Sequence, residues 1–293
     1  MYYDALKTFV TLAEVKNFTK ASEHLHISQP SVSLHIKNLE REFQTELFIR
    51  SPKHVQITPT GNILYNRAKQ MISIYEQTRE DILEHHNSIQ GELIIGASFT
   101  IGEYILPSYL SELQRNFPKL ELKVVIGNTE EIVEYVRLFQ VDIGLIEGQT
   151  NDKELSIHSF MQDELVIIYP NSNHLKLKGN ITMADLQNRT WVTREEGSGT
   201  REYLKHFIRT NGLKVKSFLT ISSNQGIKES VIQGMGISLL SYSVIERELK
   251  HGDLSIIRLE NKPFMRTLSY VYSPIMKNKR SVVAIIKVLN HND

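Results

Sequence analysis

Apolar residues over the first 43 positions recur every three or four residues, and this spacing predicts three short helices. The apolar face of the first helix consists of Leu6, Phe9, Val10 and Ala13. Thr19 is predicted to cap a second helix that ends near Leu25. Ser28 is predicted to cap a third helix, with Pro30 in its first turn, where the missing N–H has no partner to lose. The buried stripe of the third helix is predicted to be Val32, Ile36, Leu39 and Phe43.

Two helices joined by a tight turn, the second with a polar outer face, are typical of a helix-turn-helix, which places its second helix in the DNA major groove. The outer face of the third helix carries Pro30, Leu34, Lys37 and Arg41. Two interpretations of Leu34 stay open, since it either contacts thymine methyl groups or is an ordinary surface leucine. The sequence therefore predicts a protein that reads double-stranded DNA.

Two short alternating segments follow, Phe48–Arg50 and Val55–Ile57, and they predict a β-wing. The tip of this wing presents Arg50, Lys53 and His54, which are suited to contact the phosphate backbone. The alternative is a solvated hairpin tip without a ligand.

After Thr58 and Pro59, apolar residues follow a strict four-three spacing that predicts one long helix of about three and a half heptads. Its seam consists of Leu64, Ala68, Met71, Tyr75, Thr78, Ile82, His85 and Ile89. The residues expected to join two chains are Leu64, Ala68, Met71, Tyr75 and Ile82. The alternative, in which part of this surface packs on the chain's own domain, stays open.

From Gly91 onward, strands alternate with helices, which is the pattern of βαβ units around a parallel sheet. A second series of strands and helices begins near Glu164, and the last strand and helix, about 268–272 and 279–289, are expected to return to the first sheet. The sequence thus predicts an α/β region of two lobes behind the DNA-binding module.

Composition and charge narrow these expectations. The 293 residues suit two or three domains, and the absence of cysteine excludes disulfides, thiol nucleophiles and Cys-ligated zinc. No secretion signal and no apolar run of about 18 residues is present, so we expect a cytoplasmic protein without membrane contact. Residues 1–58 hold seven basic and six acidic side chains, so DNA affinity is expected to come from two modules on two half-sites.

A dense set of residues in 1–65 resembles the LysR-type transcriptional regulators. The set comprises Phe9, Ala13, Phe18-Thr19-Lys20-Ala21, Leu25, Ser28-Gln29-Pro30-Ser31-Val32-Ser33, Ile36, Leu39-Glu40, Leu47-Phe48, Arg50 and Thr58-Pro59-Thr60-Gly61. The resemblance implies an α/β protein with a winged helix-turn-helix at 1–58, a linker and dimerisation helix at 59–90, and a two-lobed, periplasmic-binding-protein-like effector domain at 91–293. Lobe I would comprise 91–163 and 266–293, and lobe II 164–265. The segment Arg194–Arg201 is similar to the branch of regulators that control Rubisco, nitrogenase-type or sulfur-assimilation operons.

Two positions depart from the family pattern. Gln44 stands where a glycine in the left-handed conformation is usual, and Ser22 stands where a second alanine is usual. By resemblance, Gln29, Pro30, Ser33 and Leu34 approach base edges, and Ser31, Lys37, Arg50 and Lys53 approach the DNA backbone.

The rule that α/β sheets bind ligands at the carboxyl ends of strands and beside helix N-termini fits three points of the second region. Ser98 and Thr100 follow its first strand, Glu147 follows the strand of residues 142–146, and residues 198–201 begin a helix. The predicted effector residues are Ser98, Thr100, Glu147, Ser198, Gly199, Thr200, Arg201 and Asn224. The alternative for the Gly197–Thr200 segment is a plain helix cap. In sulfur-assimilation relatives, hydroxyl residues hold the effector at the positions matching Ser98, Thr100, Glu147 and Thr200. Because Glu147 would repel sulfate unless Arg201 or Arg194 neutralised it, we expect a ligand with both an anionic and a donor group, such as an amino-acid-like metabolite.

The motifs of several enzyme classes are missing, including G-x-S-x-G, the P-loop, G-x-G-x-x-G and H-E-x-x-H, so we expect no catalysis, no cofactor and no metal. Rival functions are an effector-independent DNA-binding protein and a periplasmic-type solute-binding protein. The expected partners are double-stranded DNA, a small-molecule effector, a second chain through the linker helix, further chains in a homotetramer, and RNA polymerase. A ligand that closes the lobes would change operator binding and DNA bending.

Overall fold

The computed structural model describes residues 2–50, 55–83, 89–148, 150, 152–171, 182–258 and 263–290. The chain divides into two compact units, Met1–Asn87 and Ser88–Asp293, which are described separately below. Among the described residues, no helix is both long enough and apolar enough to span a bilayer.

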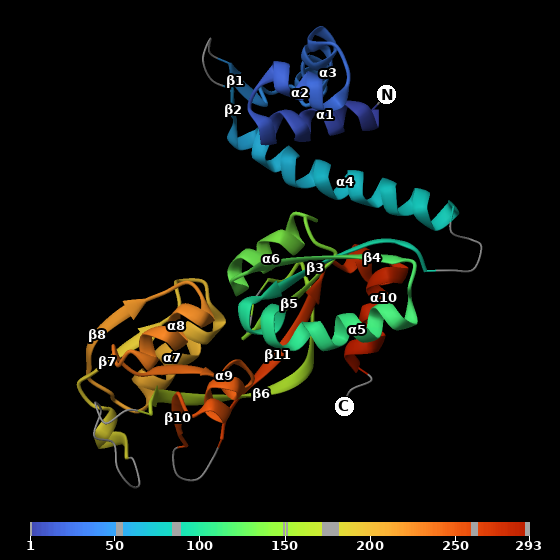
Figure 1. The fold of residues 1–293 in the computed structure, drawn as a ribbon. Coiled ribbons are helices and arrows are strands. Elements are labelled where there is room, and N and C mark those ends of the chain that lie inside the picture. The colour runs from blue at the N-terminus through green and yellow to red at the C-terminus, as the bar shows by residue number, and fades with distance from the viewer. Residues whose placement is uncertain are drawn as a thin grey trace. The chain divides into compact units, whose positions relative to one another are not determined.

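The first unit contains the predicted helices and wing (Figure 1). Its elements are α1 (Tyr2–Val15), α2 (Phe18–Leu25), α3 (Gln29–Glu42), β1 (Phe48–Arg50), β2 (Val55–Ile57) and α4 (Pro59–Leu83). Ser28 caps α3 as predicted, by accepting the backbone N–H of Ser31. The expected cap of α2 was wrong, because Asn17 accepts from Lys20 at 3.0 Å and Thr19 lies inside the helix. Gln44 does adopt the left-handed conformation expected at that position, with φ of +51°.

One apolar core joins the three short helices to the start of α4. Its fully buried members include Phe9, Leu12, Val32, Ile36 and Leu39. Phe43 departs from the predicted stripe, since α3 ends at Glu42 and the Phe43 side chain is 42% exposed. Leu64 and Ala68 of α4 are buried in this same core, so the first turns of the long helix belong to the DNA-binding module.

The long helix begins at Pro59, where Thr58 Oγ1 accepts the N–H of Gly61 at 2.9 Å. The structure describes this helix as far as Leu83, and residues 84–88 lie outside the described residues. His85 of the predicted seam lies outside the described residues. Ile89 contacts the apolar core of the second unit and therefore does not continue the seam.

The second unit begins with the first lobe. Its elements are β3 (Gly91–Ser98), the π-helix η1 (Ile101–Ile105), α5 (Leu106–Asn116), β4 (Leu120–Gly127), α6 (Thr129–Arg137), β5 (Ile143–Glu147), β11 (Phe264–Tyr272), η3 (Pro274–Asn278) and α10 (Arg280–Asn290). β3 pairs in parallel with β4 and β5. Alternate residues of the strands contact α5 and α10 on one face and α6 on the other. As predicted, the last strand and helix return to this sheet.

The second lobe lies between these segments in sequence. Its elements are β6 (Ser156–Pro170), η2 (Met183–Leu186), β7 (Arg189–Thr193), α7 (Gly199–Thr210), β8 (Val215–Thr220), α8 (Asn224–Ile232), β9 (Ser238–Ser241), α9 (Tyr242–His251) and β10 (Leu254–Ile257). α9 and β10 were not predicted from the sequence. β7 and β8 pair in parallel, and a bridge from Trp191 to Ile237 places β7 beside β9.

The main sheet is mixed rather than parallel, which corrects the sequence prediction. Its strand order is β10-β6-β11-β5-β3-β4, with β9 also paired to β6. The chain leaves the first lobe along β6 and returns along β11, so these two long strands run in opposite directions (Figure 1). Strands β6 and β11 therefore connect the lobes, and their side chains lie where both lobes meet.

Candidate functional site

The outer face of α3 is exposed and polar, as a DNA-reading helix requires. Gln29, Pro30, Lys37 and Leu34 are exposed, and Leu34 is 56% accessible. Ser31 and Ser33 are partly exposed, and the hydroxyl of Ser31 lies 2.8 Å from that of Ser28 at the start of the helix. The wing tip, including Lys53, lies outside the described residues, and only the backbone of Arg50 is described.

The residues expected to pair two chains divide into two groups. Leu64 and Ala68 are buried within their own unit, so their prediction as dimer contacts was wrong and the alternative of packing on the same domain holds for them. Met71, Tyr75 and Ile82 stay exposed, with 47%, 55% and 71% of their surfaces accessible. Exposed apolar side chains along one helix are typical of a protein interface.

Four of the predicted effector residues converge where the two lobes meet. Glu147, at the carboxyl end of β5, is the centre of this buried group. Its Oε1 atom accepts the backbone N–H of Thr100 from the first lobe at 3.0 Å. Its Oε2 atom accepts the hydroxyl of Thr200 from the second lobe at 2.7 Å. Ser98, at the carboxyl end of β3, is also buried.

Arg266, which the sequence reasoning missed, joins Glu147 to the strands that connect the lobes. Its Nη1 atom donates to Glu147 Oε2 at 2.7 Å and to the Thr200 hydroxyl at 2.9 Å. Its Nε atom donates to Asp163 of β6 at 2.7 Å, and Ser241 of β9 donates to the other oxygen of Asp163 at 2.6 Å. Arg266, rather than the expected Arg201 or Arg194, is therefore the direct cation partner of Glu147.

Burial and the charges of this group shift the pKa of each of its members. Burial alone would raise the pKa of Glu147, but Arg266 and the hydrogen bonds from Thr200 and Thr100 outweigh it and lower the pKa to about 2. Burial raises the pKa of Asp163 above its ordinary value, against the opposing effect of Arg266. The pKa of Arg266 is raised, because its two carboxylate partners outweigh its desolvation.

Two buried polar atoms, one at the end of β3 and one in the guanidinium that binds Glu147, have no hydrogen-bond partner among the residues that the structure describes. They are the hydroxyl oxygen of Ser98 and the Nη2 atom of Arg266. Buried polar atoms in folded proteins are nearly always paired with protein, water or a ligand, and an unpaired one costs roughly 1–3 kcal/mol. These two unpaired atoms are the strongest indication of a ligand site at this group.

A second polar group links the lobes through the π-helix η1. Arg194 lies over the ring of Phe99 at 4.3 Å and donates to Asn224 Oδ1 at 3.3 Å. Asn224 in turn donates to Glu103 at 3.5 Å, so this predicted residue does lie at the junction of the lobes. Glu195 neutralises Arg194 through two hydrogen bonds of 2.9 and 2.8 Å. π-helical turns occur frequently at functional sites.

The remaining predicted residues lie around the start of α7. Ser198 is buried at the N-cap position, but its side chain makes no capping hydrogen bond. Gly199 packs on the backbone of Glu147 so closely that a Cβ atom would collide with its carbonyl oxygen. Arg201 points away from Glu147, because it donates to Glu196 and to the carbonyl of Arg194 at 2.7 Å each.

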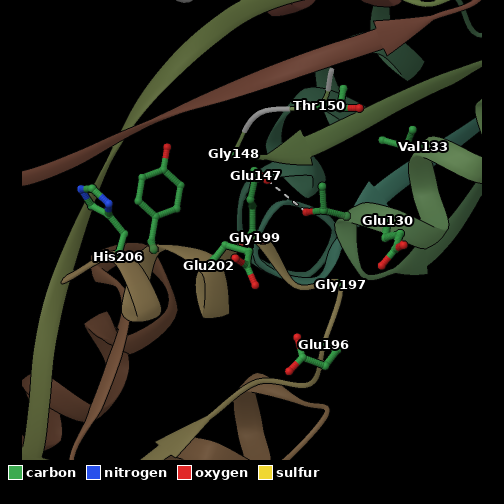
Figure 2. A pocket seen from close by; sticks show the side chains of 12 residues that line it. Glu130, Val133, Glu147, Gly148, Thr150, Glu196, Gly197, Gly199, Glu202 and His206 are labelled. Atoms are coloured by element: carbon green, nitrogen blue, oxygen red, sulfur yellow. Dashed lines mark hydrogen bonds between the residues drawn. The ribbon is translucent and has the colours of Figure 1, made fainter. Parts of the chain in front are cut away.

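An open pocket of about 830 Å³ lies between α6 and α7, next to the buried group (Figure 2). It is lined by Thr129, Glu130, Val133, Glu147, Gly148, Thr150, Glu196, Gly197, Gly199, Glu202, Tyr203 and His206. The hydroxyl of Thr129 donates to the carbonyl of Glu147 at 3.1 Å along one wall. Of the predicted effector residues, Glu147 and Gly199 line this pocket, and the other six do not.

Arg266, Asp163 and Ser241 were missed because the sequence gives no local signal for them. Arg266 is the single charged residue of β11, whereas Asp163 stands between Gln162 and Glu164 in β6, and Ser241 is the last residue of the short strand β9. The three side chains meet because β6 pairs with both β11 and β9. The register places Arg266 opposite Asp163. The one signal that could have indicated a buried ion pair is Arg266, the only charged residue of its strand.

Comparison with known proteins shows the family to which this chain belongs. Residues 3–62 match the model of the bacterial regulatory helix-turn-helix protein, lysR family, and residues 86–292 match the LysR substrate binding domain. The chain belongs to the LysR family of transcriptional regulators. It is 58% identical over 292 residues to the HTH-type transcriptional regulator CysL of Bacillus subtilis, covering 100% of this chain and 98% of CysL.

More distant proteins are similar over most of the chain as well. A protein of Phaeodactylum tricornutum named "Probable RuBisCO transcriptional regulator" is 29% identical over 272 residues, covering 91% of this chain and 89% of that protein. A full-length variant of OxyR from Pseudomonas aeruginosa has the same fold, with a TM-score of 0.80 at 22% identity, over 99% of this chain and 94% of OxyR. The resemblance inferred from residues 1–65 is confirmed, and the protein is a DNA-binding transcriptional regulator with an effector-binding domain.

Proposed function

We propose that a small anionic or zwitterionic metabolite binds at the buried group around Glu147 and changes how this LysR-type regulator binds and bends its operator. The observation that carries the proposal is the pair of unpaired buried atoms, Ser98 Oγ and Arg266 Nη2, beside a carboxylate that contacts both lobes. A ligand that offers oxygen acceptors to these atoms would satisfy them. A ligand donor could bind Glu147, whose two oxygens together accept about four hydrogen bonds.

The DNA contacts remain those expected from the sequence. Gln29, Pro30, Ser33 and Leu34 would approach base edges, and Ser31, Lys37, Arg50 and Lys53 would approach phosphates. The exposure of Gln29, Pro30, Leu34 and Lys37 supports this assignment. The relatives are named as regulators, and we infer that the chain catalyses no reaction and uses no cofactor.

Assembly would increase DNA affinity, because a module with nearly balanced charge gains little from phosphate contacts alone. Two chains would pair along the exposed α4 residues Met71, Tyr75 and Ile82, and effector domains would join two dimers into a homotetramer. A ligand that alters the angle between the lobes would then change the spacing of the DNA-binding modules, the DNA bend and the recruitment of RNA polymerase.

Calorimetric titration of the full-length protein with a panel of metabolites tests this function. The panel contains amino acids and their simple derivatives, dicarboxylates, sulfate and phosphate. We expect heat from at least one ligand that carries both an anionic and a donor group. Tight sulfate binding without any amino-acid response would contradict the proposed ligand class, and no binding by any compound would contradict a metabolite site of this kind.

A further inference from the structure

The Glu147 carboxylate occupies the position that the donors of the lobe junction would otherwise offer to a bound anion. A backbone N–H of Thr100, the Thr200 hydroxyl and the Arg266 guanidinium all donate to it, over 2.7 to 3.0 Å. A backbone N–H, a hydroxyl and a guanidinium are the donors with which proteins hold free oxyanions. Here the Glu147 carboxylate of the same molecule accepts hydrogen bonds from all three donors.

The charge balance of the buried group opposes a second anion. Glu147 and Asp163 share one cation, Arg266, and all three side chains are buried. The other buried arginine, Arg194, is matched by Glu195. With both carboxyls ionised, the group carries more negative than positive charge, and an anion that brings no donor group of its own would meet a like charge in a medium that screens poorly.

The position of Glu147 is fixed by its surroundings. Its backbone packs against Gly199, and its carbonyl accepts the hydroxyl of Thr129. Its carboxylate is ionised even in acid, with a pKa of about 2. One lone pair of Oε1 is left for a ligand, since that atom accepts only the Thr100 N–H among the described residues.

We propose that Glu147 acts as an internal anion and determines the specificity of the site. It excludes free tetrahedral oxyanions, such as sulfate and phosphate, and it selects a ligand that brings a hydrogen-bond donor, an ammonium group above all, to the lobe junction. The selection of a ligand rests on the function proposed above. The exclusion of oxyanions does not, because it is a binding property of the buried donors alone.

The test replaces the internal anion by a small hydroxyl side chain in the full-length protein. In Glu147→Thr, the Thr100 N–H, the Thr200 hydroxyl and Arg266 lose their shared acceptor, so calorimetry should show sulfate binding at least about 100-fold tighter than in the wild type. Glu147→Gln is the matched control, because it removes the same charge but keeps the position filled, and it should bind sulfate no better than the wild type. Adding Thr200→Val to Glu147→Thr should remove most of the gained affinity.

Circular dichroism and the fluorescence of Trp191, the single tryptophan, establish that each variant is folded. Glu147→Ser replaces Glu147→Thr if the latter does not fold. The proposal is overturned if the wild type binds sulfate as tightly as the folded hydroxyl variant, or if that variant gains no affinity. Equal gains in Glu147→Thr and Glu147→Gln would also overturn it, because net charge alone would then explain the effect. These readouts use sulfate, so they do not depend on whether a metabolite controls DNA binding.

Discussion

At the scale of single residues, the site depends on one carboxylate and the charges around it. The sequence indicated Glu147, Thr100 and Thr200 because each follows a strand or begins a helix, where ligand sites of α/β sheets lie. It could not indicate Arg266 as the partner, because the contact joins residues 119 positions apart through strand register. The sequence favoured Arg201, because it directly follows Thr200, but its side chain donates to Glu196 instead.

The lowered pKa of Glu147 makes stability depend on pH in a defined window. The ordinary pKa of this carboxyl is 4.5, and in the fold it is about 2. Between these values the unfolded chain binds more protons than the folded one, so the contribution of Glu147 is complete above about pH 4.5 and is lost as pH falls toward 2. The raised pKa of Asp163 acts in the opposite direction, because its protonation is easier in the fold.

Glu147→Gln removes the first effect and leaves the part of the second that burial causes, since the charge of Glu147 is the last of the causes that act on Asp163. On lowering the pH from 6 to 3, the wild type should lose about 2 kcal/mol more free energy of unfolding than the variant. Urea unfolding followed by Trp191 fluorescence measures this in the effector unit, since Trp191 is buried there. Parallel pH curves for the two proteins would contradict the assigned charge state of Glu147.

At the scale of elements, periodic patterns identified most helices and strands, and errors arose where distant contacts decide. The helix cap at Ser28 was predictable from local backbone geometry, whereas the family pattern left open whether Gln44 adopts the left-handed conformation that the structure shows. The mixed sheet could not be predicted from the sequence, since the pairing of β6 with β11 joins strands far apart in the chain. The apolar residues of α4 follow a heptad spacing, but spacing alone does not say whether Leu64 and Ala68 face a second chain or their own module.

The burial of these two residues predicts how the DNA-binding module must be truncated. A fragment of residues 1–58 lacks Leu64 and Ala68, and losing one buried leucine already costs about 2–5 kcal/mol. Such a loss is large for a domain of this size. We expect the fragment 1–58 to show no cooperative thermal transition by circular dichroism, whereas 1–83 melts cooperatively. Cooperative melting of both fragments at one temperature would show that α4 contributes nothing to the module core.

At the scale of the whole molecule, the proposed regulation needs two chains and a signal from the effector domain. The exposed residues Met71, Tyr75 and Ile82 belong to the apolar surface of α4 that is left after the module core is formed, together with Ile63 and Ile74. The lobes are joined by strands β6 and β11 and by the buried contacts of Arg266, Thr200 and Glu147. A ligand at this junction therefore acts on both lobes at once.

Two lysines on the exposed α4 surface should separate the chains. We expect the double substitution Met71→Lys and Ile82→Lys to lower the molar mass in solution from that of a dimer or tetramer, because burying unpaired charges at an apolar interface is unfavourable. Light scattering after size exclusion measures the mass. Asn62→Lys with Asn66→Lys adds the same charge at exposed polar positions of α4 and should leave the mass unchanged. An unchanged mass in the first variant would exclude this surface as the dimer contact.

A ligand at the lobe junction should change how the assembled regulator holds its DNA. The most direct test is the bend of an operator fragment, taken from genome-wide mapping of bound sites, measured by energy transfer between dyes at its two ends. The full-length protein is measured with and without the compound that binds most tightly in the calorimetric panel. We predict that the ligand changes the energy transfer and the length of the protected footprint at saturating protein. An identical bend and footprint with and without a ligand that binds the protein would contradict the account.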